Sequence, residues 1–309
     1  MNLDKLETEQ RNPDSEHIDA LSTIDMVRLI NHEDQKVAKA VENILDSVAK
    51  AVDVIADQLK NGGRLIYIGS GTSGRLGILD AVECPPTFST DPDQVVGLIS
   101  GGYPAMFKAV EGAEDDEEAG KKDLIGINFC KKDVLVGIAA SGRTPYVLGA
   151  MKYARTCGAH VIGIACCSDS KVEEEAEIAI LPKPGPEVIT GSTRMKCGTA
   201  EKMVLNMLST GAMIRLGKVY GNLMVDVRPS NEKLMERCKR IVSEVTKVSK
   251  EEAEKVLEQC NYQPKIAIVM ILFHVDANEA TKMLTESGGR IYDLKGKNRA
   301  EADCGIEGE

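Results

Sequence analysis

Three short segments of the 309-residue chain combine glycine with small hydroxyl residues: Gly69-Ser70-Gly71-Thr72-Ser73-Gly74, Ala140-Ser141-Gly142-Arg143-Thr144-Pro145 and Thr190-Gly191-Ser192-Thr193-Arg194. Glycine lets the backbone approach a ligand closely, and hydroxyl groups add adjustable hydrogen-bond donors. Each segment leads into a helical pattern, so its free amides would lie at a helix N-terminus, where anions bind. Any one segment is explained as well by helix capping. Three of them at separate strand ends predict a cradle for one phosphate group and the hydroxyls of its sugar.

A dinucleotide site is the main rival interpretation of the first segment, because Gly69, Gly71 and Gly74 satisfy the G-x-G-x-x-G pattern after a strand. That pattern also expects an acidic residue about 20 positions later, at the end of the second strand. The second strand here ends in Leu98-Ile99-Ser100-Gly101-Gly102, without a carboxylate. The hydroxyls between the glycines also favour a monophosphate over a pyrophosphate, so NAD is only a minor alternative. No Gly-Lys-Ser/Thr follows, which excludes a P-loop.

Carboxylates are the second chemical resource of the sequence. Glu83 stands before Cys84-Pro85-Pro86, where we expect the two prolines to end a helix and hold the turn rigid. A cluster at 111–118 is mostly a solvated acidic face, but Glu111 and Glu114 would share one face of a predicted helix. Spacing alone does not decide which of these two turns inward. An acid and a base working together would need different protonation states, so one should be partly desolvated.

Composition excludes several other classes of function. The net charge is −10 and aromatic residues make up 4% of the chain with no tryptophan, which argues against binding to nucleic acid or to an anionic membrane. No apolar run approaches the roughly 20 residues needed to span a bilayer. The four histidines are scattered, so we expect no metal site. Nine cysteines without a C-x-x-C pair are typical of reduced thiols in a cytoplasmic protein.

Short apolar runs alternate with helical patterns from Arg64 onward. The runs predict strands at 65–68, 95–99, 134–140, 161–165 and 178–181, and helices are expected at 75–82, 105–120, 145–156 and 170–177. Continuous β-branched runs are typical of parallel strands that are covered on both faces. The fold class predicted is therefore α/β, with a doubly wound five-stranded parallel sheet.

Helical patterns also precede and follow this sheet. The division expected is an N-terminal helical segment over 1–54, a sheet domain over 55–218, a C-terminal helical region over 219–297 and a flexible tail over 298–309. Beyond Gly198 the sequence predicts only helices, at 200–216, 232–247, 250–259, 264–273 and 276–286.

Longer stretches of the sequence resemble one known family. They are Thr8-Glu9-Gln10-Arg11-Asn12-Pro13, IGSGTSGRLGILDAVECPPTF (68–88), AVEGAEDD (109–116), GIAASGRTPYV (137–147), TGSTRMKCGTAEKMVLNMLSTG (190–211) and GNLMVDV (221–227). In these stretches the chain resembles the N-acetylmuramic acid 6-phosphate etherases, members of the sugar isomerase (SIS) domain superfamily that are related to the glucokinase regulatory protein. Thr193 and Cys197 depart from the family pattern, but both are conservative in size.

The resemblance implies an enzyme that cleaves the D-lactyl ether of N-acetylmuramic acid 6-phosphate, giving N-acetylglucosamine 6-phosphate and D-lactate in amino sugar recycling. It implies that Glu83 is the acid that protonates departing lactate and that Glu114 is the base at C2, with Glu111 as the substitute base or a sugar ligand. It also implies an SIS fold, a homodimer whose site lies near the subunit boundary, and no cofactor. The contacts expected for the phosphate and sugar are Ser70, Thr72, Ser73, Ser141, Thr144 and Ser192.

Two other functions fit the same cradle. An aldose–ketose phosphosugar isomerase would need a single base and would not need Glu83. A sensor without enzymatic activity would bind a phosphosugar and control a partner protein, but the chain has room for only one SIS domain. Its short N-terminal region also lacks a basic recognition helix.

Overall fold

The computed structural model describes residues 7–227, 229 and 231–294. At its centre lies a five-stranded sheet in the order β2-β1-β3-β4-β5, with every neighbouring pair parallel. The strands are β1 (Leu65–Gly69), β2 (Val95–Ile99), β3 (Val134–Ile138), β4 (His160–Ile164) and β5 (Ile178–Ile180). The predicted α/β class and its five-stranded parallel sheet are confirmed.

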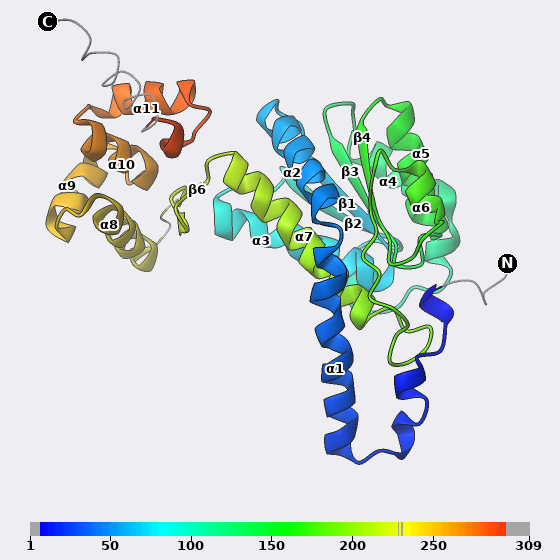
Figure 1. Ribbon diagram of the computed structural model, residues 1–309. Coiled ribbons are helices and arrows are strands. Elements are labelled where there is room, and N and C mark those ends of the chain that lie inside the picture. The colour runs from blue at the N-terminus through cyan, green and yellow to red at the C-terminus, as the bar shows by residue number, and fades with distance from the viewer. Residues whose placement is uncertain (1–6, 228, 230, 295–309) are drawn as a thin grey trace, which may run out of the picture. The chain divides into compact units, whose positions relative to one another are not determined.

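Helices cover both faces of the sheet (Figure 1). Those on one face are α2 (Leu45–Lys60), α3 (Gly71–Phe88) and α7 (Lys196–Arg215), and those on the other are α4 (Glu117–Gly126), α5 (Pro145–Thr156) and α6 (Lys171–Glu175). Glycines in the strands allow this close packing. A Cβ atom on Gly97 would lie 2.6 Å from the backbone of Ile78 in α3, and one on Gly137 would lie 2.7 Å from the sulfur of Met151 in α5.

The helix predicted over 105–120 is wrong. This stretch holds two 3-10 turns, η5 (Tyr103–Met106) and η6 (Ala113–Asp115), and α4 begins only at Glu117. Gly112 adopts a left-handed conformation with φ of 73°, which breaks the helical path between Glu111 and Glu114. Asp116 then caps α4 by accepting a hydrogen bond from the amide of Ala119. The acidic pair therefore does not share a helical face.

The two prolines do not end the first helix of the sheet domain, which is a second correction. Helix α3 runs through Pro85 and Pro86 to Phe88. Cys84 and Phe88 are both buried at helical spacing, and the amide of Ser89 donates to the carbonyl of Pro85 at 2.9 Å to close the last turn. Burial of these side chains offsets the hydrogen bonds that the prolines cannot donate.

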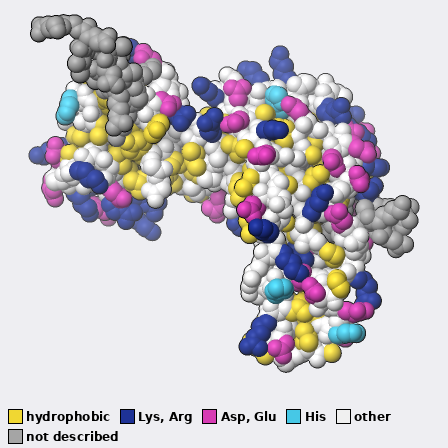
Figure 2. Space-filling view, in the orientation of Figure 1, with side chains coloured by type: hydrophobic (Ala, Val, Ile, Leu, Met, Phe, Trp, Pro, Cys, Tyr) yellow, Lys and Arg dark blue, Asp and Glu magenta, His cyan; other side chains and the backbone are white. Residues whose placement is uncertain are grey.

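The N-terminal region begins with three 3-10 turns, η2 (Glu7–Glu9), η3 (Pro13–Ser15) and η4 (Ile18–Ala20), and continues in the long helix α1 (Thr23–Glu42). Ser22 caps α1 by accepting a hydrogen bond from the amide of Asp25. Apolar side chains are visible at the beginning of α1 (Figure 2), where Leu21, Ile24 and Val27 are exposed.

The described residues form two compact units. One comprises the residues up to Cys84 together with Asp91–Gly211, and the other comprises Pro85–Thr90 and the residues from Ala212 on. The boundary thus falls within α3 and again within α7. The predicted N-terminal segment is part of the first unit, and the predicted tail at 298–309 lies outside the described residues.

The second unit has its own apolar core. Its helices are α8 (Glu232–Thr246), α9 (Lys250–Gln259), α10 (Pro264–Phe273) and α11 (Ala277–Glu286), which match the predicted ranges closely. A short hairpin of β6 (Val219–Tyr220) and β7 (Leu223–Met224) precedes them, where the sequence predicted only helices. Within the described residues, no helix combines the length and apolar character needed to cross a membrane.

Candidate functional site

A cavity of about 420 Å³ lies where the chain leaves the carboxyl ends of β1 and β3. All three hydroxyl-bearing segments reach it, together with the turn η6 and the N-terminal turn η2. Its lining comprises Glu9, Ser70, Gly71, Thr72, Ser73, Glu114, Asp115, Ile138, Ala139, Ala140, Ser141, Arg143, Thr144, Pro145, Gly191, Ser192, Thr193 and Arg194. The six side chains expected from the sequence to contact phosphate and sugar are therefore brought together.

The first segment forms the N-terminus of α3. Gly71 has φ of 53°, a left-handed conformation that turns the chain from β1 into the helix. The first amide bonded within this turn is that of Gly74, which donates to the carbonyl of Ser70, so the preceding amides have no carbonyl of the helix to bond. The hydroxyl oxygen of Ser70 is buried without a hydrogen-bond partner. Amides and hydroxyl thus offer unused donors at the positive end of the helix dipole.

The second segment forms the N-terminus of α5. Gly142 has φ of 65°, and a Cβ atom there would lie 2.3 Å from the Cβ of Ser170, so the backbone packs where no side chain fits. Thr144 precedes Pro145 at the first helical position, where the missing amide hydrogen of proline is not needed. The Nε of Arg143 is buried without a partner, which leaves a guanidinium donor available beside the hydroxyls.

The third segment leads into α7, and the buried side chains of Glu187 and Lys196 fix the point where this helix begins. Both carboxylate oxygens of Glu187 accept backbone hydrogen bonds, from the amides of Lys196 at 2.9 Å and Cys197 at 3.0 Å. The side chain of Lys196 donates to Glu33 of α1 at 2.6 Å, and each of these two side chains is 1% exposed. These contacts fix the end of the loop that carries Ser192 and Thr193 into the cavity.

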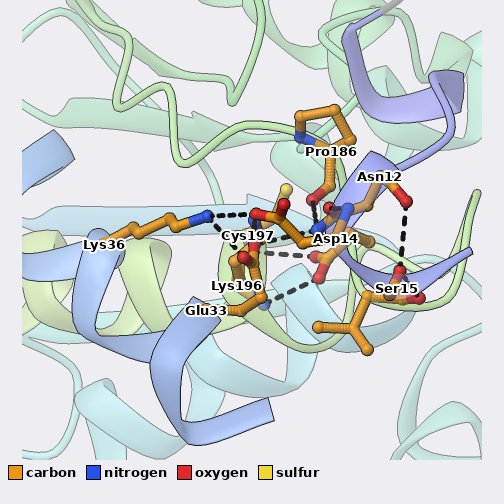
Figure 3. A network of polar contacts seen from close by, with 10 residues as sticks. Asn12, Asp14, Ser15, Glu33, Lys36, Pro186, Lys196 and Cys197 are labelled. Atoms are coloured by element: carbon orange, nitrogen blue, oxygen red, sulfur yellow. Dashed lines mark hydrogen bonds and ion pairs between the residues drawn. The ribbon is translucent and has the colours of Figure 1, made fainter. Parts of the chain in front are cut away.

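The N-terminal region joins the same polar network (Figure 3). The amide group of Asn12 donates to Glu33 at 2.8 Å and to the carbonyl of Pro186 at 3.2 Å, and Lys36 also donates to Glu33. Burial alone would raise the pKa of Glu33, but the hydrogen bonds from Lys196, Lys36 and Asn12 lower it to about 2. Glu33 is therefore a carboxylate that ties three distant parts of the chain together.

The carboxylates expected to catalyse a reaction are placed differently from each other. Glu114 lines the cavity, from η6, and Glu111 does not. Both are exposed, so the partial desolvation expected of one acid is not seen in the single chain. Glu83 is exposed on α3 and lies outside the cavity lining of the single chain. Within one chain the structure thus brings Glu114, but not Glu83, to the hydroxyl groups.

Sequence reasoning gave no role to two acids at this site. Glu9 lines the cavity, and its Oε2 would lie 3.2 Å from a Cβ atom placed on Gly191. Glu201 of α7 is fully buried and accepts a hydrogen bond from the hydroxyl of Ser73 at 2.9 Å. The sequence feature that could have identified Glu201 is a single acidic residue within the apolar helical pattern at 200–216. Among the described residues, no group of three or more metal-ligating side chains gathers.

Family models match both units. Residues 47–155 match the N-terminal SIS domain of the glucokinase regulatory protein, and residues 221–268 match the C-terminal lid domain of the same protein. The parallel sheet with its hydroxyl-lined cavity thus defines an SIS-domain protein. The chain is 59% identical to an N-acetylmuramic acid 6-phosphate etherase of Photobacterium profundum over 94% of this chain and 97% of that protein.

A second relative with the same description, from Pasteurella multocida, is 59% identical over 93% of this chain and 95% of its own length. A third, from Clostridium botulinum, is 55% identical over 95% and 97%. The chain belongs to the N-acetylmuramic acid 6-phosphate etherase family. Among solved structures, a phosphoheptose isomerase from Neisseria gonorrhoeae is 18% identical with a TM-score of 0.49, covering 62% of this chain and 98% of its own.

Proposed function

We propose that this protein is an enzyme that cleaves the D-lactyl ether of N-acetylmuramic acid 6-phosphate with water, giving N-acetylglucosamine 6-phosphate and D-lactate in amino sugar metabolism. One observation carries the proposal. The segments GSGTS and ASGRT, which are typical of SIS domains, meet VEGAE and TGSTR from the etherase-like stretches around one cavity, although all four come from distant parts of the chain. The relatives over nearly the whole chain carry the name of this activity.

The substrate phosphate would bind where the N-termini of α3 and α5 meet. Unbonded amides of the first helical turns and the hydroxyls of Ser70, Ser73 and Ser141 are donors suited to phosphate oxygens. Arg143 and Arg194 supply positive charge at the same cavity, which offsets the acids Glu114 and Asp115 nearby. The other proposed contacts, Thr72, Thr144 and Ser192, remain available for sugar hydroxyls.

The chemistry needs one base and one acid. In the open-chain aldehyde, the carbonyl at C1 acidifies the proton at C2, and Glu114 removes it. The bond from C3 to the lactyl oxygen then breaks, the oxygen takes a proton from Glu83, and a double bond forms between C2 and C3. Water activated by Glu83 adds to C3, and Glu114 returns the proton to C2. The same two carboxyl groups serve both halves of the reaction.

Because Glu83 lies outside the cavity of its own chain, we propose that a second copy of the chain supplies it in a homodimer. Glu83 is flanked on α3 by Leu79 and Val82, which are 45% and 58% exposed. Exposed apolar side chains around a charged group are typical of a surface that a partner covers. A cytoplasmic location would suit this enzyme, since the eight cysteines that the structure describes are free thiols.

Release of D-lactate tests the proposed reaction. Incubation with N-acetylmuramic acid 6-phosphate should yield D-lactate and N-acetylglucosamine 6-phosphate in equal amounts, measured by a coupled D-lactate dehydrogenase assay and by mass spectrometry. In water enriched in oxygen-18, the label should enter the sugar at C3 and not the lactate. A ketose phosphate without lactate would instead identify an isomerase, and binding without turnover would identify a sensor.

Mixing two inactive variants tests the shared site. In a symmetric dimer, Glu83→Gln and Glu114→Gln subunits that exchange freely should regain about a quarter of the wild-type activity, because half of the dimers are mixed and each has one intact site. If both acids act within one chain, every active site in the mixture still lacks either Glu83 or Glu114, and no activity returns. Mixing each variant with itself gives the baseline.

A further inference from the structure

A buried carboxyl group lies directly behind the hydroxyl-lined wall of the cavity. Glu201, in the second turn of α7, is 0% exposed, and its Oε1 is 2.9 Å from the hydroxyl oxygen of Ser73 in the first turn of α3. Its other oxygen, Oε2, is buried without a hydrogen-bond partner. Ser73 is also one of the residues that line the cavity, so the residue that contacts the buried acid borders the proposed phosphate position.

The surroundings of Glu201 disfavour a negative charge. The titratable groups that act on it are the Glu187 carboxylate, from the segment before α7, and the Cys166 thiol, which follows β4. The lysines on its own helix are engaged elsewhere, because Lys196 pairs with Glu33 and Lys202 faces Asp80. The pKa of Glu201 is raised to about 8, because burial and the nearby Glu187 carboxylate raise it more than the hydrogen bond from Ser73 lowers it.

The Ser73 hydroxyl has a single hydrogen, which it can donate either to Glu201 or to the ligand but not to both. An ionised Glu201 can only accept, so it would hold that hydrogen and leave lone pairs of Ser73 facing the ligand. A protonated Glu201 can donate to Ser73 through the same 2.9 Å contact, and the serine hydrogen is then free for a phosphate oxygen. Ser73 can therefore donate a hydrogen bond to phosphate only while Glu201 is protonated, and phosphate binding in turn favours the protonated form of Glu201.

We propose that Glu201 is a positioning residue for phosphate binding, which must carry its proton for Ser73 to donate to the phosphate of the ligand. The proposal rests on the proposed function only in taking the ligand to be a sugar phosphate. It does not depend on the lactyl ether or on the roles of Glu83 and Glu114. The sign of the pH effect follows, because the ligand binds the protonated form and affinity must fall as pH rises through the pKa of Glu201.

Calorimetric titration with N-acetylglucosamine 6-phosphate between pH 7.0 and 9.5 tests the proposal. The phosphate is already a dianion over this range, so its own ionisation contributes little. The dissociation constant of the wild-type protein should rise by about 10- to 30-fold, because deprotonation at a pKa of about 8 limits the loss over this range and one hydrogen bond to a charged group has a similar worth. Glu201→Gln should remove this rise, because an amide donates to Ser73 at every pH. Its affinity should match that of the wild-type protein at pH 7.0.

Ser73→Ala is the second variant, and it keeps the test decisive if Glu201→Gln does not fold. It should bind as weakly at pH 7.0 as the wild-type protein does at pH 9.5, with no further loss as pH rises. If all three proteins lost affinity equally as pH rises, the proposed role of Glu201 would be wrong. The same conclusion would follow if the affinity of the wild-type protein did not change with pH, or if the wild-type protein did not bind the ligand at pH 7.0. Failure of lactate release, with this pattern of binding intact, would count against the etherase reaction alone.

Discussion

Replacement of Glu114 by glutamine should lower kcat for lactate release by about 10²- to 10⁴-fold, the usual contribution of a general base. Glutamine keeps the size of the side chain and its ability to form hydrogen bonds, but it cannot take the proton from C2. KM should change little, because the phosphate donors that we propose are the hydroxyls and the helix N-termini, and Glu114 is not one of them. Steady-state kinetics with the coupled lactate assay measures both constants.

Solvent exchange separates this role from a general loss of activity. The wild-type enzyme should exchange the C2 proton of N-acetylglucosamine 6-phosphate with deuterium oxide, and Glu114→Gln should not. Glu111→Gln is the matched control, since that glutamate is exposed and outside the cavity lining. It should keep kcat within about twofold of the wild type, as expected for a surface substitution. A large loss in Glu111→Gln with normal exchange in Glu114→Gln would reverse the assignment of the base.

Replacement of Lys196 by methionine should lower the free energy of unfolding by about 3–5 kcal/mol, because it removes one partner of a buried ion pair. Glu33 would remain buried with only the donors of Asn12 and Lys36. The pair is 1% exposed on both sides, so water cannot replace the lost ammonium group. Urea denaturation followed by circular dichroism measures the effect, provided that the slope of the transition is unchanged.

Two comparisons make the effect of Lys196 specific. Lys36→Met removes a half-exposed partner of the same carboxylate and should cost only about 0–1 kcal/mol. The wild-type protein should also lose stability as pH falls from the usual glutamate value of 4.5 toward about 2, because Glu33 has a lowered pKa in the folded state. A destabilisation by Lys196→Met no larger than that by Lys36→Met would show that the buried pair contributes little.

The sheet could be predicted from the sequence because its signals are local. Runs such as Val134–Ile138 are apolar at every position, and only parallel strands covered on both faces bury all of them. The loops after β1 and β3 carry their own glycines and hydroxyls, so the cavity was also predictable. The helix expected over 105–120 was wrong because Gly112 adopts a left-handed conformation and Asp116 an extended one, and a periodic apolar pattern contains no information about such residues.

Residues that act through distant contacts were not predictable in the same way. Nothing near Glu9 or Glu201 in the sequence shows that the first reaches the cavity and the second lies behind Ser73. The partner of Glu33 is 163 residues away, at Lys196. The sequence resemblance included these stretches without giving their acids a role, and only the folded arrangement brings them to one place.

The network of Asn12, Glu33 and Lys196 has a consequence for how the protein is made. During synthesis the N-terminal turns emerge first, yet the carbonyl of Pro186 and the ammonium of Lys196 that hold them emerge about 170 residues later. The wall contributed by Glu9 can therefore close only after nearly two thirds of the chain has left the ribosome, and a nascent chain that stops earlier has no complete cavity. For the same reason, a fragment without Glu9 and Asn12 would lack part of the cavity wall and one donor of the network that holds it.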